Sequence, residues 1–512
     1  MIQLLLSLII FNSLTFAAPI ITQTVIVTAP IKIVTITIGQ TEVLDATTIN
    51  SKPIETNTAT HTLQFATEST SSIFNQESSS SYISQIPSSL SQISSTPTTT
   101  LSPSSFITST TTDTSTSSES FPQPSVSTIN QISNSNPILS KAVSSTPQSG
   151  YAYMSTINKI WQRFWQKGNW NQNDGICEGT SFVTPPVWSL AVLGKAITNT
   201  GDSSGTNTII SSILKYFDES TGAFFDYPNS GKIYTDDNAQ LMWVFTDAYK
   251  ITNNQEYLKY AENILNYLRT QNFNNKGGIL WTTNGNYIAS ISTVETALAA
   301  IRLYEVNGDE SLIDTARECM DFMFDYFQDP NDKLFYDGLD KTAFDSVNKG
   351  KLTYTVGCAI STLSKLYHLK NDNEALSRAI ELANAATKID GAFYTVEKVW
   401  NNSLKYSHSL FAGFGDAFKS SSEFDQFKPE VIRQANYIYE FLNDPHDQNL
   451  YFDAANDGTT TVYNKYASVF GVSSDYTPSN SIFCNNNSGG PTSKDFLINA
   501  SAAQILYHLA NY

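Results

Sequence analysis

From about residue 150 onward, apolar side chains recur three or four positions apart in stretches of a dozen or more residues, with polar residues between them. This period is that of amphipathic helices. Pro186 suits a first helical turn, and Asn307 followed by Gly308 suits a helix end. The pattern predicts twelve helices, at 151–166, 186–198, 208–219, 236–252, 255–271, 290–306, 310–327, 352–369, 373–388, 407–419, 429–442 and 494–510.

A short aromatic motif recurs between these helices, at 222–226, 278–281, 334–337, 391–394 and 450–453. Its final aromatic residues lie 56, 55, 58 and 58 residues apart. Such a regular period indicates repeated supersecondary units, and each interval has room for two helices. We therefore predict an all-α fold, an (α/α)6 barrel of six helical hairpins in which the last helix pairs with the first. Each aromatic loop then leads into an inner helix, so the loops and the inner N-termini share one face.

The first 149 residues lack the helical pattern. Residues 1–17 are an apolar run that ends in small residues, which predicts a secretory signal peptide. Residues 18–60 alternate β-branched and polar side chains, so they form either a small hairpin or an extended segment. About half of residues 61–149 are Ser or Thr, a composition that cannot bury enough apolar surface to fold. We expect a disordered, O-glycosylated stalk there, followed by the barrel at 150–512.

The charge balance restricts the partners. The chain has 47 acidic and 30 basic side chains and a formal net charge of −17. Nucleic acids and anionic membranes both require a basic footprint, so we expect neither as a partner. No segment after the signal peptide is apolar for long enough to span a bilayer, and the C-terminus lacks the hydrophobic tail of a GPI signal. Neutral sugar polymers make no demand on charge.

Two neighbouring carboxyl groups, Asp236 and Asp237, stand at the start of the fourth predicted helix, after Thr235 as its N-cap. Acidic residues are common in a first helical turn because the helix dipole and the unpaired N–H groups favour them. That purely structural explanation is the alternative to a catalytic one. The predicted barrel favours the catalytic explanation, because it puts the start of this helix on the rim that carries the aromatic loops.

The sequence Tyr-Thr-Asp-Asp-Asn-Ala at 234–239, with Trp243 and the segment 247–252 after it, resembles glycoside hydrolase family 76. So do the Gly-Gly-Ile-Leu-Trp segment at 277–281 and the helix at 297–304. The resemblance covers about 151–512, and its most specific part is the Asp-Asp helix together with the Gly-Gly-x-x-Trp loop.

Membership in that family implies an (α/α)6 barrel and an activity on mannan. The family contains endo-α-1,6-mannanases and fungal cell-wall proteins thought to process or transfer mannan-bearing glycans. It uses an adjacent Asp-Asp pair for retaining chemistry. By this resemblance Asp236 is the nucleophile and Asp237 the acid/base.

The geometry of a helix start agrees with that chemistry. Retaining glycosidases need two carboxyl groups about 5–5.5 Å apart. Neighbouring α-carbons lie about 3.8 Å apart and successive helical side chains diverge by about 100°, so adjacent residues can reach this separation. The helix N-terminus favours one ionised carboxylate, and repulsion between the two raises the pKa of the other.

Aromatic side chains on the rim are candidates for stacking on sugar rings, and packing within the loops is the equal alternative. The candidates for substrate binding are Trp188, Trp281, Tyr336, Tyr354 and Tyr394, with Phe452 beside them. Two stretches depart from the family pattern. Thr355 and Val356 replace an Asn-Gln pair after Tyr354, and 287–293 lacks the expected Lys-Asn. These departures remove polar groups expected near a substrate.

The remaining special residues predict no metal site and no cofactor. The five histidines have no metal-ligand spacing, and no phosphate-binding loop or Gly-x-Ser-x-Gly elbow occurs. Four cysteines allow three disulfide connectivities, and the two that fall in predicted helices, Cys319 and Cys358, are equally explained as buried thiols. Patterns for N-glycosylation occur at Asn401, Asn486 and Asn499, the last inside a predicted helix.

We therefore expect a secreted, monomeric glycosidase or transglycosidase that acts on α-1,6-linked mannan, extracellular or in the cell wall. Hydrolysis and transfer share one glycosyl-enzyme intermediate, so the sequence does not separate them. Two alternatives remain. The first is a non-catalytic, mannan-binding wall glycoprotein, which the departures favour and the intact Asp pair disfavours. The second is an unrelated hydrolase or epimerase on the same barrel, which predicts a base-like histidine in the cleft.

Overall fold

The computed structural model describes residues 22–27, 32–37, 149–177 and 182–512. The chain divides into two units, 1–70 and 71–512. In the first unit, strands β1 (Thr22–Val27) and β2 (Lys32–Thr37) pair antiparallel, with Thr22 opposite Thr37. Of the two options for this stretch, the hairpin is therefore the one observed. The predicted signal peptide at 1–17 lies outside the described residues, as does the predicted stalk at 61–149 except for Ser149, which begins helix α3 (Ser149–Phe164).

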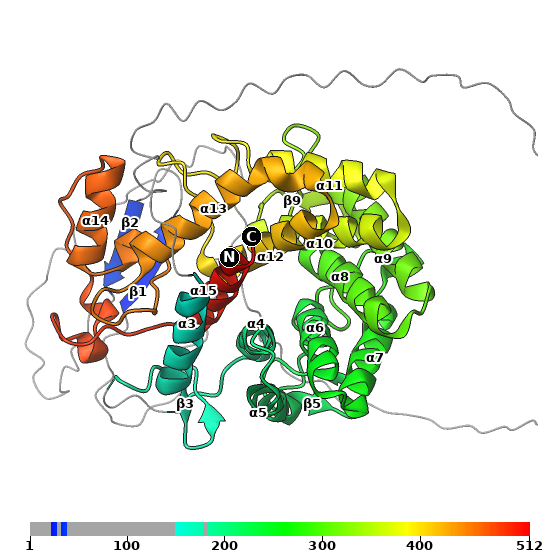
Figure 1. The fold of residues 1–512 in the computed structure, drawn as a ribbon, viewed down its shortest axis with the longest axis horizontal. Helices are drawn as coiled ribbons and strands as arrows, with labels where there is room; N and C mark the ends of the chain where they lie inside the picture. The colour runs from blue at the N-terminus through cyan, green and yellow to red at the C-terminus, as the bar shows by residue number, and fades with distance from the viewer. Residues whose placement is uncertain (1–21, 28–31, 38–148, 178–181) are drawn as a thin grey trace, which may run out of the picture. The chain divides into compact units, whose positions relative to one another are not determined.

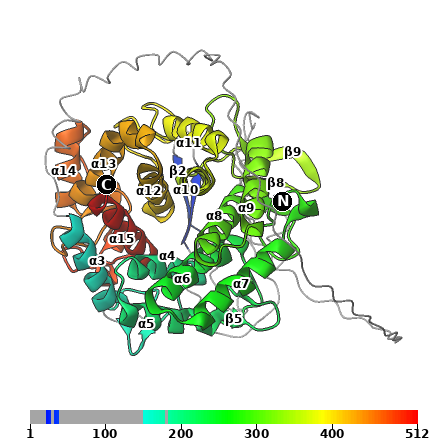
Figure 2. The ribbon, with the colours of Figure 1, turned by 45° about the vertical axis from the view of Figure 1, so that its right-hand side comes forward.

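The second unit is built around a closed ring of six inner helices, visible in Figure 1 and from a second angle in Figure 2. Each inner helix packs against the next one, and the last packs against the first. They are α4 (Val187–Thr198), α6 (Thr235–Thr252), α8 (Ser290–Asn307), α10 (Thr353–Lys370), α12 (Leu404–Ser420) and α15 (Phe496–Ala510). The inner helices are apolar almost all round, as helices buried between two layers must be.

An outer helix packs against each inner one. The outer helices are α3 (Ser149–Phe164), α5 (Ser203–Ile213), α7 (Gln255–Thr270), α9 (Ser311–Phe322), α11 (Asn373–Ala386) and α13 (Lys428–Tyr437). The first of them, α3, packs against the last inner helix, α15, so the first and last helices described in this unit form the sixth hairpin. The predicted (α/α)6 barrel is thus confirmed.

The structure differs from the predicted helices in a few places. Helix α14 (Thr460–Phe470) was not predicted. Helix α5 begins at Ser203, whereas the predicted helix begins at residue 208. Asp202 caps the helix at the earlier position, because its side chain accepts hydrogen bonds from Ser204 N and Gly205 N. Small β-elements also join the loops: β3 (Trp165–Gln166) pairs with β4 (Asn169–Trp170), β5 (Phe217–Asp218) with β6 (Ala223–Phe224), and β7 (Tyr287–Ala289), β8 (Gly338–Asp340) and β9 (Ala343–Asn348) form one sheet.

The aromatic loops have a structural reason to recur. In each of five inner helices, the first backbone N–H donates to an acceptor on the loop that precedes the next inner helix. The pairs are Val187 with Asp226 O, Thr235 with Trp281 O, Ser290 with Asp337 O, Thr353 with Asn402 Oδ1, and Leu404 with Asp453 Oδ1. Each loop therefore reaches over the N-terminus of the preceding inner helix, which brings loop residues and first-turn residues to one face.

A second hydrogen bond joins the loops to the inner helices. The fourth residue of an inner helix accepts a hydrogen bond from a loop backbone N–H: Asn238 from Phe224, Thr293 from Ile279, and Asn499 from Tyr451. All three side chains are fully buried. The loop's aromatic side chains can then pack inward while its backbone remains hydrogen-bonded, as buried backbone groups require.

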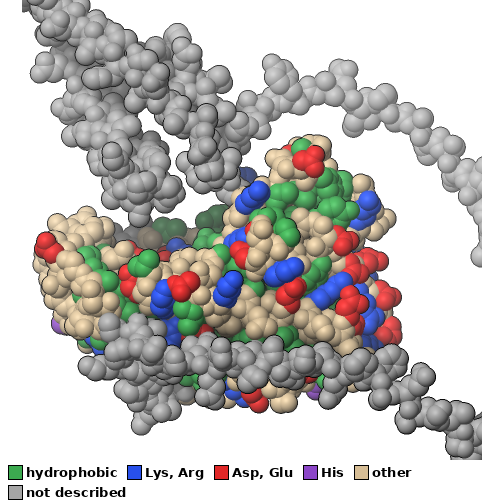
Figure 3. Space-filling view, turned by 90° about the horizontal axis from the view of Figure 1, so that it is seen from above, with side chains coloured by type: hydrophobic (Ala, Val, Ile, Leu, Met, Phe, Trp, Pro, Cys, Tyr) green, Lys and Arg blue, Asp and Glu red, His purple; other side chains and the backbone are tan. Residues whose placement is uncertain are grey.

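Charged side chains on the outside are paired across helices. On the face seen in Figure 3, Lys and Arg side chains lie among Asp and Glu side chains. Arg317 on α9 lies 3.1 Å from Asp372, the N-cap of α11, and Lys370 on α10 lies 2.7 Å from Glu310. Within the described part of the chain, no helix has both the length and the apolar character needed to cross a membrane.

Candidate active site

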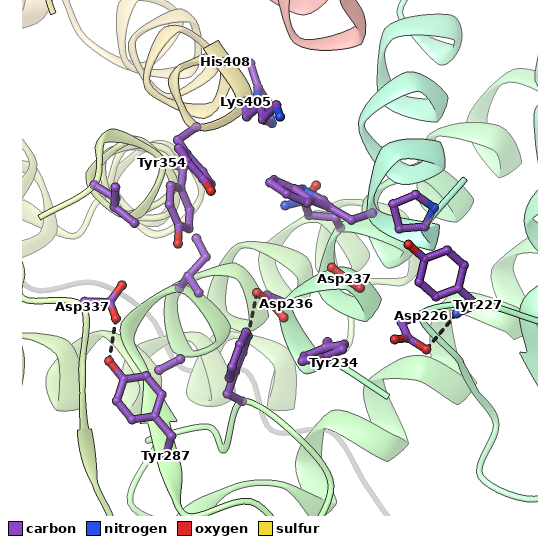
Figure 4. A pocket seen from close by; sticks show the side chains of 18 residues that line it. Asp226, Tyr227, Tyr234, Asp236, Asp237, Tyr287, Asp337, Tyr354, Lys405 and His408 are labelled. Carbon is purple, nitrogen blue, oxygen red and sulfur yellow. Dashed lines mark hydrogen bonds between the residues drawn. The ribbon is translucent and has the colours of Figure 1, made fainter. Parts of the chain in front are cut away.

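A cavity of about 450 Å³ opens at the N-terminal ends of the inner helices (Figure 4). Its wall combines first-turn residues of inner helices with residues of the aromatic loops. The lining residues are Pro186, Trp188, Asp226, Tyr227, Tyr234, Asp236, Asp237, Gln240, Trp281, Tyr287, Ala289, Ile291, Asp337, Leu352, Tyr354, Lys405, Tyr406 and His408.

The repeat explains which residues meet there. The second residue of each of five inner helices lines the cavity: Trp188, Asp236, Ile291, Tyr354 and Lys405. Because the five helices start at the same level, side chains at equivalent positions point to the same place. The loop residues that hold the helix N-termini, Asp226, Trp281 and Asp337, complete the wall.

Asp236 is partly buried and held by an indole. Trp281 Nε1 donates to Asp236 Oδ2 at 3.1 Å, whereas Asp236 Oδ1 has no hydrogen-bond partner among the described residues. Burial raises the pKa of Asp236 to about 6; the nearby carboxyl group of Asp337 adds to the rise, and the Trp281 donor opposes it. The helix starts one residue earlier than predicted, and Thr235 is not its cap, because the Thr235 hydroxyl donates to Leu280 O at 2.7 Å.

Asp237 occupies a different environment. Burial raises its pKa well above the usual value, and the neighbouring carboxyl groups of Asp236 and Asp226 raise it further. Asp226 itself accepts a hydrogen bond from Tyr227 N at 2.8 Å. The two adjacent aspartates therefore differ in proton affinity, because the indole N–H favours the charged form of Asp236 and like charges disfavour that of Asp237.

A third carboxyl group, Asp337, is fixed on the other side of Asp236 (Figure 4). Its Oδ2 accepts hydrogen bonds from the Tyr287 hydroxyl at 2.5 Å and from Asn348 Nδ2 at 2.8 Å. Burial raises the pKa of Asp337, and both donors oppose this rise. The side chain is thus held in one orientation on the cavity wall.

The opposite wall is aromatic. The ring of Tyr406 stacks on Trp188 at 5.8 Å and on Tyr354 at 5.2 Å between centroids. Lys405 lies 3.4 Å from Asp495 on this side. His408 is buried, and burial lowers its pKa to about 4, so it is uncharged at neutral pH. Aromatic side chains with a few fixed polar groups opposite them are typical of pockets for small ligands.

The structure brings five of the seven predicted site residues together: Asp236, Asp237, Trp188, Trp281 and Tyr354. The other two lie outside the cavity wall. The hydroxyl of Tyr394 donates to Glu430 at 2.7 Å beneath the loop surface, and Lys351 lies over the ring of Tyr336. Phe452 is likewise buried, under Lys494. Tyr394 and Phe452 are thus packed within the loops, whereas Tyr336 is only partly buried.

Sequence reasoning missed four notable wall residues: Asp226, Asp337, Gln240 and Tyr406. The first two carried a signal, because an Asp follows the aromatic residues in several copies of the repeat. Gln240 and Tyr406 carried none, since each stands in an ordinary helical pattern.

The cysteines and glycosylation patterns are also placed. Cys177 and Cys484 form a disulfide, and Cys319 and Cys358 are buried free thiols. Asn499 is fully buried, whereas Asn401 and Asn486 are exposed. Among the residues that the structure describes, no cluster of His, Cys, Asp or Glu has the arrangement of a metal site.

Comparisons with known proteins agree with this architecture. The model of glycosyl hydrolase family 76 matches residues 151–471, and the chain belongs to this family. A comparison with curated proteins gives no match.

Among solved structures, the chain is similar to a GH76 alpha-mannanase from Bacteroides thetaiotaomicron, with a TM-score of 0.57 and 18% identity over 73% of this chain and 98% of that one. It is also similar to an inactive variant of an alpha-1,6-mannanase from Salegentibacter sp. HEL1_6, in which two neighbouring aspartates are replaced by asparagine, in complex with alpha-1,6-mannotriose (TM-score 0.54, 19% identity, 71% and 99% coverage). A third is Dfg5 from Chaetomium thermophilum in complex with glucosamine (TM-score 0.51, 12% identity, 74% and 91% coverage). At these identities the likeness concerns the fold.

Proposed function

We propose that the protein is a retaining glycosidase or transglycosidase that acts on α-1,6-linked mannan. The observation that carries this proposal is the pair Asp236–Asp237, which lines the cavity. The two carboxyl groups lie in different environments, so their pKa values differ. Pairs of carboxyl groups with divergent pKa values are the mark of acid/base assignment in glycosidases.

In the proposed reaction, ionised Asp236 attacks the anomeric carbon while Asp237 gives its proton to the departing glycosidic oxygen. A covalent glycosyl-enzyme forms and the leaving sugar departs. Asp237, now ionised, takes a proton from an incoming hydroxyl, whose oxygen displaces Asp236 from the anomeric carbon. Water as the acceptor gives hydrolysis, and a sugar hydroxyl gives transfer. The Trp281 N–H supports the nucleophile assignment, because it stabilises charge on Asp236.

The substrate assignment rests on the family, on one structural neighbour and on the aromatic wall. Members of the same fold include an alpha-1,6-mannanase that was studied with alpha-1,6-mannotriose as a variant lacking two adjacent aspartates. An aromatic wall formed by Trp188, Tyr406 and Tyr354 opposite fixed carboxyl groups suits a neutral pyranose, whose hydroxyls need acceptors.

A second candidate substrate is a glycan that includes an amino sugar. Four carboxyl groups, from Asp226, Asp236, Asp237 and Asp337, line the cavity, and Lys405 is the one lysine among its lining residues. An ammonium group is favoured in such surroundings. The neighbour Dfg5 was solved in complex with glucosamine.

We further propose that the chain is secreted and monomeric, with residues 1–17 removed as a signal peptide and 61–149 acting as a glycosylated stalk. The Ser/Thr-rich composition of the stalk supports an extracellular or cell-wall location.

The test is to incubate the purified mature protein with α-1,6-mannan and measure new reducing ends. We expect activity in the wild type and losses of at least about a hundredfold in D236N and D237N, because each removes a group that bonds or transfers a proton in the reaction. D325N, at an exposed carboxyl group in the turn after α9, is the matched control. Products longer than the substrate without new reducing ends would identify transfer. Mannan binding with neither product would favour the non-catalytic alternative.

A further inference from the structure

The sixth residues of the inner helices form a layer one helical turn beyond the second residues, five of which line the cavity. Five of the sixth residues can hydrogen-bond: Gln240, Glu295, Cys358, Ser409 and Ser501. All are buried, and Gln240 is the member that also lines the cavity. The layer thus connects the cavity floor with the interior of the ring.

Glu295 is the ionisable carboxyl group of this layer, and it is fully buried on α8. Gln240 Nε2 donates to Glu295 Oε1 at 2.9 Å. Glu295 Oε2 has no partner among the described residues. The nearest arginine along the same helix, Arg302, lies instead beside Asp416 at 3.6 Å.

The groups around Glu295 oppose a negative charge there. Helix α6 contributes the carboxyl groups of Asp236 and Asp237, which disfavour a further negative charge, and helix α10 contributes the uncharged hydroxyl of Tyr354 and thiol of Cys358, so no cation is among these groups. A buried carboxylate without a cation costs several kcal/mol, so the group takes up a proton instead. Burial and the nearby Asp236 accordingly raise the pKa of Glu295 well above its usual value.

An uncharged Glu295 has a consequence for Asp236. A negative charge on Glu295 would favour protonation of the proposed nucleophile, so the neutral form leaves Asp236 able to ionise. Through its Oε1, Glu295 also orients the amide of Gln240, because Nε2 is bound to Glu295 and the carbonyl oxygen is left to accept a bond from an occupant of the cavity.

We propose that Glu295 is a positioning residue: in its uncharged form it holds the amide of Gln240 at the cavity floor, and Gln240 accepts a hydrogen bond from a hydroxyl group of the bound sugar. This inference rests on the proposed glycan-binding function of the cavity. It makes Gln240 a specificity-determining residue, selective for a sugar that carries a hydroxyl at that depth.

Four variants test the binding part, with α-1,6-mannotriose as the probe for affinity and α-1,6-mannan for kinetics. In Q240L and E295L, we expect affinity to fall and KM to rise about three- to tenfold, the effect of one lost hydrogen bond, with a smaller change in kcat. The double variant should be no worse than Q240L alone, because Glu295 acts through Gln240. E295Q should recover most of the affinity lost in E295L, because an amide can still accept from Gln240. Additive losses, or a failure of E295Q to recover affinity, would overturn the proposal.

The proton on Glu295 is tested separately by infrared spectroscopy at neutral pH. The wild-type minus E295Q difference spectrum should contain the carbonyl band of a protonated carboxyl group. A carboxylate band in its place would show that Glu295 is charged and would overturn the proposal. This measurement needs no turnover and no folded leucine variant. If the protein is inactive on mannan and still shows the band, the proposed function is contradicted, but Glu295 is shown to be protonated.

Discussion

The indole of Trp281 is one of the groups that make the two adjacent aspartates chemically unequal. Both carboxyl groups are partly buried, and burial alone would raise both pKa values. Only Asp236 receives the indole N–H, at 3.1 Å. A donor to the charged form lowers a pKa, so the division of labour between nucleophile and acid depends on a residue of the neighbouring loop.

W281F should therefore move the acidic limb of the pH–activity profile to higher pH. Asp236 must be ionised to attack, and its pKa of about 6 places the wild-type limb near that pH. Loss of the donor raises this pKa, by about one unit if the hydrogen bond is worth the usual amount for a charged acceptor. The measurement is kcat/KM for α-1,6-mannan against pH. A limb that stays in place while activity falls would mean that Trp281 contributes by stacking alone.

Neutralising Asp237 should stabilise the protein. Its folded-state pKa is raised, so the folded state binds more protons than the unfolded state, and stability falls as pH rises from the unfolded value through the folded one. We expect D237N to unfold at higher temperature at pH 7, by about 1–3 kcal/mol in free energy, and the gain to vanish near pH 4. The loss of a helix-dipole contact, about 0.3–1 kcal/mol, is smaller.

Thermal unfolding of wild type and D237N at several pH values measures this effect. The exposed variant D325N should show no such pH-dependent gain. A D237N protein that melts below the wild type at pH 7 would mean that the negative charge is stabilised in the fold, which contradicts the environment assigned to it.

The catalytic candidates were predictable from sequence, whereas much of their surroundings was not. Asp236 and Asp237 are adjacent and stand in a recognisable motif, so a linear pattern contains them. Gln240, Glu295 and Tyr406 meet only because helices that are far apart in sequence start at one level. Such register is set by loop-to-helix hydrogen bonds, which no local pattern of hydrophobicity reveals.

At the scale of elements, the repeated unit is an inner helix with a loop fixed to it. In the last unit, Asn499 Oδ1 accepts from Tyr451 N at 2.8 Å, and Asn499 Nδ2 donates to Asp495 O at 2.8 Å. The side chain is fully buried, which makes it unavailable to a glycosylating enzyme in the folded protein although its sequence pattern fits.

N499A should lower the free energy of unfolding by about 2–4 kcal/mol, because it leaves the buried Tyr451 N–H unpaired and opens a small cavity. S501A removes the same glycosylation pattern but keeps Asn499, so it is the matched control. It should change the free energy of unfolding little and leave the glycan mass unchanged. Denaturant unfolding measures the stability, and the intact mass of protein from a secreting host measures the glycan mass. A lower glycan mass in S501A would show that Asn499 is modified before folding.

Helix positions were predicted well where the apolar face is regular, as in α6, α7 and α8. The prediction failed at α14, whose aromatic residues Tyr466 and Phe470 pack onto Tyr437 and Phe441 of the neighbouring segment. Only two α14 residues, Val462 and Ala467, are fully buried, so the helix lacks the wide apolar stripe that makes a pattern visible.

At the scale of the whole barrel, the ring is closed by its two ends. Helix α3 packs on α15, and a buried polar cluster joins the segments that flank them. Arg163 lies 3.0 Å from both Asp174 and Asp447, and Lys494 lies 2.7 Å from Asp444. Because these groups are buried and mutually paired, removing one partner would leave a charge that the interior does not tolerate.

The disulfide between Cys177 and Cys484 closes the same junction covalently across 307 residues of sequence. A crosslink over so long a loop lowers the conformational entropy of the unfolded chain, which raises the free energy of unfolding by as much as about 5 kcal/mol in the chain-entropy account.

We therefore expect the C177S/C484S double variant to melt roughly 5–15 °C below the wild type, and each single variant to melt close to the double variant. C319S, at a buried free thiol on α9, is the control for cysteine removal: it keeps the disulfide, so reductant should lower its melting temperature as much as it lowers that of the wild type. Calorimetry with and without reductant measures the difference. An unchanged melting temperature in the double variant would mean that the interhelical packing and the Arg163 cluster close the ring without help, and that the barrel's stability does not depend on an oxidising compartment.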